Sequence, residues 1–117
     1  MSNGFNFNEW SSKQIVEEAE KTAKALIGKR SLDTQLRKIY DYILKERGRG
    51  DKERIPMLRA KLAYAVSRNQ DLYHLFKVID EKIKDAVNVD LDKLADFMEA
   101  VIAYYKFEPI KEKMERR

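Results

Sequence analysis

Lysine and arginine side chains in the middle of the sequence are the residues whose types and spacing suggest a chemical role. At 100° per residue, Arg37, Lys38 and Lys45 share an arc beside or opposite the apolar stripe of one predicted helix. Lys61 and Arg68, seven residues apart, lie on one line of the next predicted helix, about 10 Å apart along its axis. Cations at such intervals can follow a phosphate backbone without reading bases. The predicted phosphate contacts are Arg37, Lys38, Lys45, Lys61 and Arg68, with Arg47, Arg49 and Arg54 as additions.

Positive charge is concentrated in one third of the chain. Residues 29–68 hold 12 basic and 5 acidic residues, whereas residues 1–28 and 69–117 have net charges of −1 and −2. Such an uneven distribution indicates a polyanionic partner. The alternative is a solvent-exposed face on which acids such as Asp41 neutralise their neighbours, but 5 acids cannot balance 12 bases.

Aromatic side chains that could stack on bases are scarce in this region. Tyr40 belongs to a predicted core stripe, which leaves Tyr42 and Tyr64 as candidates. The pattern therefore favours contact with a nucleic-acid backbone over sequence-specific recognition of splayed bases.

Patterns for catalysis and metal binding are hard to find. The single histidine, His74, has no serine or cysteine pattern to pair with, and one histidine cannot build a typical catalytic zinc site. A calcium-binding loop starting at Asn88 is a weaker alternative, because Lys93 stands where its sharp turn requires glycine. We therefore expect a protein that is not an enzyme, with no cofactor and no metal. The residues at the calcium-loop positions are Asn88, Asp90, Asp92, Asp96 and Glu99.

The apolar residues repeat with helical periodicity along the sequence, and no segment reads as a strand. A first helix is expected from Ser11, which with Gln14 resembles a capping box, to Gly28. The fifth predicted helix is apolar on more than half of its circumference, which indicates a central place in the bundle or coverage by another molecule. The four later helices are expected from residues 31–33 to Gly48, from Pro56 to Arg68, from Leu72 to Ile83 and from residues 88–90 to Pro109.

These elements predict an all-α fold, a single-domain bundle of about five helices. We expect an N-terminal extension at residues 1–10, the bundle at residues 11–108 and a basic tail at residues 109–117, because Pro109 should end the last helix. No apolar run approaches the roughly 18 residues that span a bilayer, and the first ten residues do not read as a signal peptide. No membrane contact and a cytoplasmic location are therefore expected.

Three short stretches carry a resemblance to a known family. They are DTQLRK at residues 33–38, KLAYAVSR at residues 61–68 and EAVIAYYKF at residues 99–107. In this order they resemble the small subunit of type III-A CRISPR effector complexes, the second member of the Csm series. The matching positions are Leu36, Arg37, Ser67, Arg68, Glu99, Ala100, Ala103, Tyr104, Lys106 and Phe107.

The resemblance implies a helical bundle without nuclease activity that contacts RNA, namely the target-strand backbone of the crRNA–target duplex. It implies as partners the large subunit and the backbone subunit of the Csm complex. It also implies self-association in a stacked filament, and it leaves open whether the isolated chain is a homodimer. Base pairing with the guide reads the sequence in such complexes, so this subunit needs only shape and charge. In this reading Tyr104 packs and Lys106 reaches a helix end or a partner.

Two functions of other classes stay open at this point. One is a small helical DNA-binding protein, and the other is an adaptor whose basic face meets an acidic protein. Weak, sequence-insensitive RNA binding that falls steeply with salt would separate the RNA-binding function from both.

Overall fold

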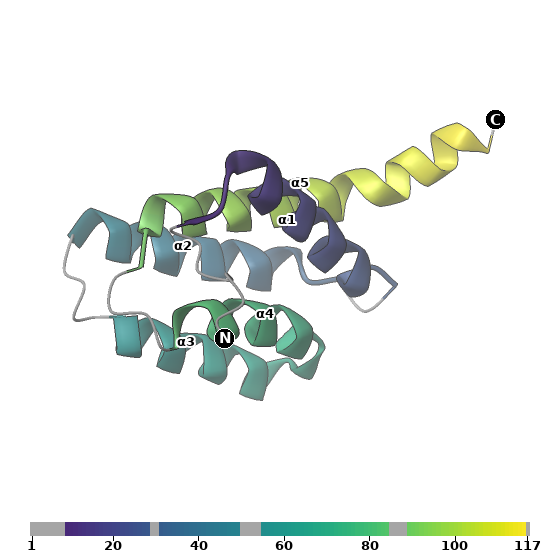
Figure 1. The fold of residues 1–117 in the computed structure, drawn as a ribbon. Coiled ribbons are helices and arrows are strands. Elements are labelled where there is room, and N and C mark those ends of the chain that lie inside the picture. Colours follow the sequence, from purple (N-terminus) through teal and green to yellow (C-terminus); the bar gives the residue numbers. More distant parts are fainter. Residues whose placement is uncertain (1–8, 29–30, 50–54, 85–88, 117) are drawn as a thin grey trace.

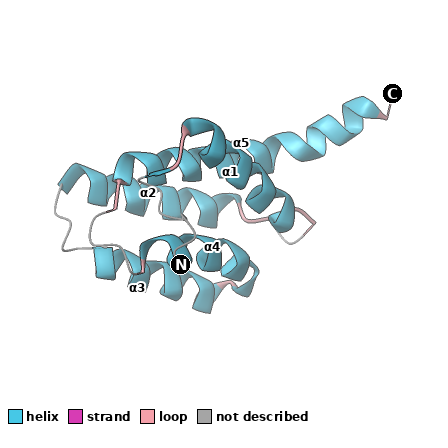
Figure 2. Ribbon diagram, in the orientation of Figure 1, coloured by secondary structure: helices cyan, strands magenta, loops and turns pink. Residues whose placement is uncertain are grey.

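The computed structural model describes residues 9–28, 31–49, 55–84 and 89–116, and these residues form helices joined by short connections (Figures 1 and 2). No strand occurs in these ranges, so the predicted all-α bundle is confirmed. None of the described helices combines the length and apolar character needed to cross a membrane. The elements are α1 (Ser12–Leu26), α2 (Asp33–Arg49), α3 (Ile55–Arg68), the 3₁₀ turn η3 (Gln70–Leu72), α4 (Tyr73–Ile83) and α5 (Leu91–Glu115).

Helix α5 is the centre of one half of the bundle, where it packs against α1 and α2. Helices α3 and α4 lie below these three in Figure 1, with α3 against α2 and α4 against α1. Phe97 and Val101 of α5 are fully buried, as is Leu94 on the neighbouring stripe. The broad apolar surface predicted for the fifth helix is therefore explained by packing against two helices at once.

The helix ends follow the local signals in the sequence. Ser11 and Gln14 form a reciprocal capping box at the start of α1, with backbone-to-side-chain hydrogen bonds of 2.8 and 3.2 Å. Gly28, just after α1, has a φ of +93°, a conformation that side-chain-bearing residues rarely adopt. Asp90 caps α5 by accepting a hydrogen bond of 3.2 Å from the backbone N–H of Lys93.

The prediction that Pro109 ends the last helix is wrong. Helix α5 continues through Pro109 to Glu115, although the proline removes one backbone donor from the helix. Strong helix formers follow the proline, and Arg116 pairs with Glu112 at 2.6 Å across one turn. On the other side of the proline, the hydroxyl of Tyr105 accepts a hydrogen bond of 3.0 Å from the backbone N–H of Leu32. These contacts on both sides of Pro109 stabilise the helix by more than the loss of one backbone hydrogen bond destabilises it.

Trp10, which the sequence assigned to the N-terminal extension, lies in the hydrophobic core. Its side chain is only 7% exposed, and the Nζ atom of Lys82 lies 5.0 Å from the centre of its ring. Its carbonyl accepts a hydrogen bond of 2.9 Å from the Nζ of Lys93. The bundle therefore uses this residue to tie the start of the chain to α4 and α5.

Candidate nucleic-acid interface

Helix α2 carries its basic residues on two different flanks. Its buried line, with Leu36, Ile39 and Ile43, faces the core, and α3 and α5 pack on either side of that line. The flank toward α3 holds Lys38, Tyr42, Lys45 and Arg49, and the flank toward α5 holds Arg37 and Arg47. The two sets follow from the 3.6-residue period of the helix.

On the α3 side, lysine and arginine side chains are paired with tyrosine rings. The Nζ of Lys61 lies 5.1 Å from the centre of the Tyr42 ring on α2. The guanidinium of Arg68 lies 5.8 Å from the centre of the Tyr64 ring, and its Nη1 donates a hydrogen bond of 3.1 Å to the Tyr64 hydroxyl. Arginine is charged at every physiological pH, and this hydrogen bond raises the pKa of Arg68 further. Both contacts orient a cation along the line where α2 meets α3.

We call the basic residues along this line the cationic seam. Lys61 and Arg68 adjoin α2, and the helical period puts the members on α2 on the flank that holds Tyr42. All members except Lys61 are exposed to solvent. Lys61 is the member of the seam that pairs with a carboxylate: its Nζ lies 3.9 Å from the Oε2 of Glu46, a side chain that is 1% exposed. The other four members form no ion pair with a carboxylate among the described residues. The members of the cationic seam are Lys38, Lys45, Arg49, Lys61 and Arg68.

The seam ends in a polar hollow of about 580 Å³ between the start of α2 and the end of α3. Ser31 and Gln35 line it from the α2 side, and Ser67, Arg68 and Asn69 line it from the other. These residues show that α2 and α3 run antiparallel, because Lys61 meets the second half of α2 while Arg68 meets its beginning. Arg68 therefore stands at one end of the seam, beside hydrogen-bonding groups.

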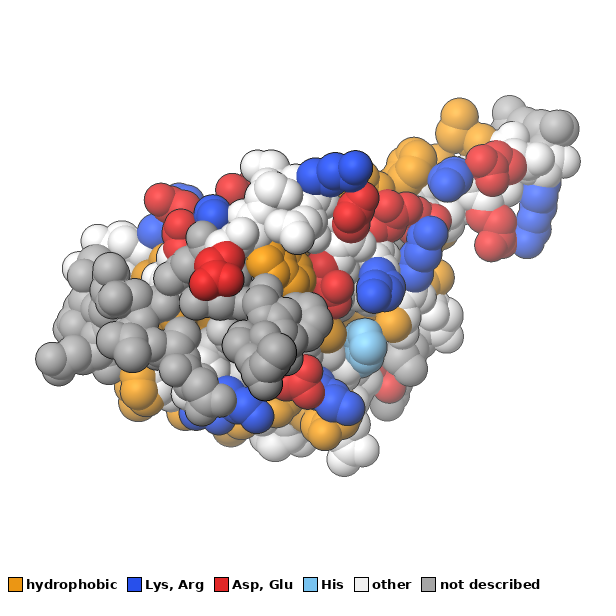
Figure 3. Space-filling view, in the orientation of Figure 1, with side chains coloured by type: hydrophobic (Ala, Val, Ile, Leu, Met, Phe, Trp, Pro, Cys, Tyr) orange, Lys and Arg blue, Asp and Glu red, His pale blue; other side chains and the backbone are white. Residues whose placement is uncertain are grey.

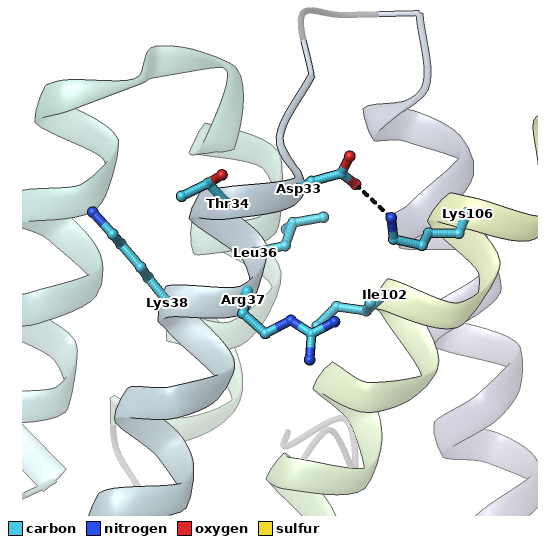
Figure 4. A pocket seen from close by; sticks show the side chains of 7 residues that line it. All are labelled: Asp33, Thr34, Leu36, Arg37, Lys38, Ile102 and Lys106. Atoms are coloured by element: carbon cyan, nitrogen blue, oxygen red, sulfur yellow. Dashed lines mark ion pairs between the residues drawn. The ribbon is translucent and has the colours of Figure 1, made fainter.

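Arg37 lies away from the seam. It lines a shallow pocket of about 320 Å³ between α2 and α5, where it points toward Ile102, whereas Lys38 points away from α5 (Figure 4). At the rim of this pocket, Lys106 forms an ion pair of 3.3 Å with Asp33 in the first turn of α2. The sequence predicted that Arg37 and Lys38 share one arc of the helix. In the structure they lie on different flanks of α2, because α3 and α5 pack on either side of it. Lys106 reaches a helix end, as expected.

The remaining basic residues divide in the same way. Arg47 pairs with Asp92 of α5 at 3.5 Å, so its charge is partly neutralised. Arg49 is exposed at the end of α2, and Arg54 lies outside the described residues. Arg59, which the sequence did not single out, forms a two-pronged contact with Asp80 of α4 at 2.6 and 3.2 Å, which ties α3 to α4.

The residues considered for catalysis or metal binding are dispersed. His74 is exposed on α4. Asp92, Asp96 and Glu99 lie along helix α5 and not in a loop, while Asn88 falls outside the described part of the chain. No group of three or more histidine or acidic side chains within the described ranges could hold a metal ion.

Comparison with known proteins finds a family match over nearly the whole bundle. A family model described as Csm2 Type III-A matches residues 9–111, which include α1 to α4 and most of α5. No curated protein and no solved structure matches the chain significantly. The matched range contains every member of the cationic seam as well as Trp10. The chain therefore belongs to the Csm2 family, whose members are subunits of the type III-A Csm complex of CRISPR systems.

Proposed function

We propose that this subunit is non-catalytic and holds the backbone of guide and target RNA in the Csm complex without reading sequence. It would serve antiviral defence in the cytoplasm, together with the large subunit, the backbone subunit and stacked copies of itself. The observation that carries the proposal is the cationic seam, with four cations unpaired by carboxylates in the described residues. Phosphate contacts of this kind position an RNA strand but carry no base information.

The spacing along the seam supports contact with successive phosphates. Lys38 and Lys45 on α2, like Lys61 and Arg68 on α3, are seven residues apart, which is about 10 Å along a helix axis. Lys61 and Arg68 stand on the side of α3 next to α2, and the helical period puts Lys38 and Lys45 on the flank of α2 toward α3, so the two pairs form neighbouring rows. Rows of fixed cations suit a regular polyanion such as an RNA strand.

The tyrosines beside the seam support recognition without base specificity. Tyr42 is half-buried and covered on one face by Lys61, so this ring is poorly placed for stacking. Tyr64 is 59% exposed, but it holds the Arg68 guanidinium. Single-strand binders that grip bases use several open aromatic faces, and the seam has at most one.

Target-RNA binding by the assembled complex tests the proposal. The variant carries Lys38→Ala and Lys45→Ala, which remove two exposed cations of the seam. The control carries Lys13→Ala and Lys77→Ala, which remove two exposed cations from α1 and α4. We expect the seam variant to bind target RNA roughly tenfold more weakly at 0.1 M salt, while the control is within twofold of the wild type.

The outcomes separate this proposal from its rivals. Equal affinity for all three proteins would show that the seam does not hold RNA. A seam variant that loses affinity for duplex DNA more than for RNA would favour a DNA-binding protein. Loss of binding to an acidic partner subunit, with RNA capture intact, would favour an adaptor.

A further inference from the structure

The last turns of α5 carry an exposed apolar stripe. We call it the C-terminal stripe; it consists of Ala103, Phe107, Ile110 and Met114, spaced by four, three and four residues on one helix face. Phe107, Ile110 and Met114 are 46%, 55% and 64% exposed. Such spacing is the pattern that packs one helix against another.

The bundle itself does not cover this stripe. The buried residues of α5 end at Val101, and beyond it the Tyr105 hydroxyl contacts Leu32 between α1 and α2. Ile110 borders a shallow pocket with Ile27 and Gly28 but stays 55% exposed. The end of α5 extends past the other helices in Figure 1, and the molecule is 49 Å in its longest dimension. In Figure 3 this projecting end shows hydrophobic atoms next to both signs of charge.

A projecting helix of this kind would be stabilised by packing against a partner. A short helix outside a bundle is marginal in water, and Pro109 removes one of its backbone hydrogen bonds. A helix that packs on the stripe would bury its three large side chains and hold the segment in its helical form. An exposed apolar face rimmed by charges is typical of an interaction site.

The charges beside the stripe indicate which helix fits. On one side of the stripe stand Lys106 and Lys113, and on the other stands Lys111. Lys106 is already paired with Asp33, so Lys111 and Lys113 carry this argument. The carboxylates of Glu108 and Glu115 lie further round the helix. The rim of the stripe is therefore positive.

A second copy of the same stripe is a poor occupant. In either a parallel or an antiparallel pair of identical stripes, these lysines would face other lysines, and like charges at such positions disfavour the pair. Among the other exposed large apolar side chains of the described residues, Met57 and Tyr64 share one face of α3, while Val16 and Tyr73 stand alone on α1 and α4. The α3 face fits the C-terminal stripe poorly, because Arg68 holds the Tyr64 ring and would face the lysine rim.

We propose that the C-terminal stripe docks an amphipathic helix of a different Csm-complex subunit, one whose apolar stripe is flanked by glutamate or aspartate. Apolar contacts would supply the affinity, and the lysine rim would select the acidic partner. The proposal uses the membership of this chain in the Csm complex but not its proposed RNA contacts. The two proposals therefore stand or fall separately.

Two designed peptides test the charge selection on the full chain. Both contain three heptads with the same leucine stripe, and they differ only in carrying glutamate or lysine beside it. We expect fluorescence anisotropy at 0.1 M salt to show at least tenfold tighter binding of the glutamate peptide. The Lys111→Glu and Lys113→Glu variant should reverse this preference. Equal binding of both peptides, or binding of neither, would overturn the proposal.

Variants of the stripe test the apolar contact. Ile110→Ser and Met114→Ser together should weaken binding of the glutamate peptide at least tenfold. The matched control, Met57→Ser and Tyr73→Ser, changes two other exposed apolar residues and should bind as the wild type does. Because all four side chains are exposed, circular dichroism should show folded bundles for both variants.

Assembly with the other Csm subunits gives the decisive result. The Ile110→Ser and Met114→Ser variant should be incorporated into the purified complex at least fivefold less than the wild type. The Met57→Ser and Tyr73→Ser control should be incorporated normally, and the stripe variant alone should bind single-stranded RNA as the wild type does, so a failure of docking is distinguishable from a failure of RNA binding. Normal incorporation of the stripe variant would overturn the proposal. So would self-association, measured by sedimentation, that the stripe variant removes, because a second copy would then be the occupant.

Discussion

The ammonium group of Lys61 lies 5.1 Å above the ring of Tyr42, so a cation of α3 covers an aromatic side chain of α2. The same ammonium lies 3.9 Å from the carboxylate of Glu46, which is buried at the contact between the two helices. One side chain thus joins α2 to α3 and places a positive charge beside the RNA-binding surface that we propose. Its role in stability and its role in binding can be measured separately.

Replacing Lys61 by methionine should destabilise the bundle. The change keeps most of the apolar stem but removes the charge near the buried carboxylate of Glu46, which should cost about 1–3 kcal/mol. The control, Lys45→Met, removes an exposed charge and should change the free energy of unfolding by less than about 0.5 kcal/mol. Urea denaturation measures both, and equal effects would contradict the structural role of Lys61.

Arg59 and Asp80 should be energetically coupled. Their two-pronged contact of 2.6 and 3.2 Å links α3 to α4, and the Asp80 side chain is 16% exposed. A double-mutant cycle with Arg59→Ala and Asp80→Ala should give a coupling of about 1 kcal/mol in the free energy of unfolding. Independent, additive effects of the two changes would show that the contact contributes nothing.

Helical periodicity in the sequence was enough to predict most of the architecture. Which residues share a surface depends on how the helices pack, and periodicity alone does not predict this. The stripes of α2 and α5 and the capping signals at Ser11 and Gly28 are local features, and they predicted the helices well. The division between Arg37 and Lys38 could not be predicted in the same way. The two residues are adjacent in sequence, and only the placement of α3 and α5 on opposite flanks of α2 separates them.

The two ends of the chain were harder to predict for physical reasons. Pro109 reads as a helix end because it removes a donor, yet the residues on both sides support the helix through it. Trp10 stands in a stretch without helical periodicity, so no repeating pattern marked it as a core residue. Trp10 contacts Lys82 and Lys93, which are more than 70 residues away in the sequence.

Replacing Trp10 by alanine should destabilise the bundle strongly. The ring is 7% exposed, and losing a buried aromatic side chain should lower the free energy of unfolding by about 3–5 kcal/mol. Thermal denaturation followed by circular dichroism measures the loss. A control at an exposed ring, Tyr73→Ala, should cost less than about 1 kcal/mol. A small effect of Trp10→Ala would place the residue outside the core.

Lys82 should make stability depend on pH. Burial lowers the pKa of its ammonium group, against the opposing pull of Glu18 and Glu81, while Lys21 adds to the lowering. The unfolded chain then binds more protons than the folded chain between the lowered pKa and the ordinary value of 10.5. The free energy of unfolding should therefore rise with pH through this window, relative to that of a Lys82→Met variant.

Chemical denaturation of both proteins between pH 7 and pH 10.5 checks this expectation. The methionine keeps an unbranched side chain at this position but cannot titrate, so the pH-dependent difference between the two proteins belongs to the ammonium group. A difference in the free energy of unfolding that stays constant with pH would contradict the effect of burial on Lys82. A wild type that loses stability relative to the variant as pH rises would contradict it as well.

The salt dependence of RNA binding tests the central claim most directly. Binding of the chain to two unrelated single-stranded RNAs is measured between 50 and 200 mM salt, for the wild type, the Lys38→Ala and Lys45→Ala variant, and the Lys13→Ala and Lys77→Ala control. Each phosphate contact contributes about 0.7 to the slope of log affinity against log salt, so the seam variant should lose about 1.4 of this slope on both RNAs. The control should keep the slope of the wild type. An unchanged slope in the seam variant, or an affinity that depends on the RNA sequence, would contradict a cationic seam that holds the RNA backbone.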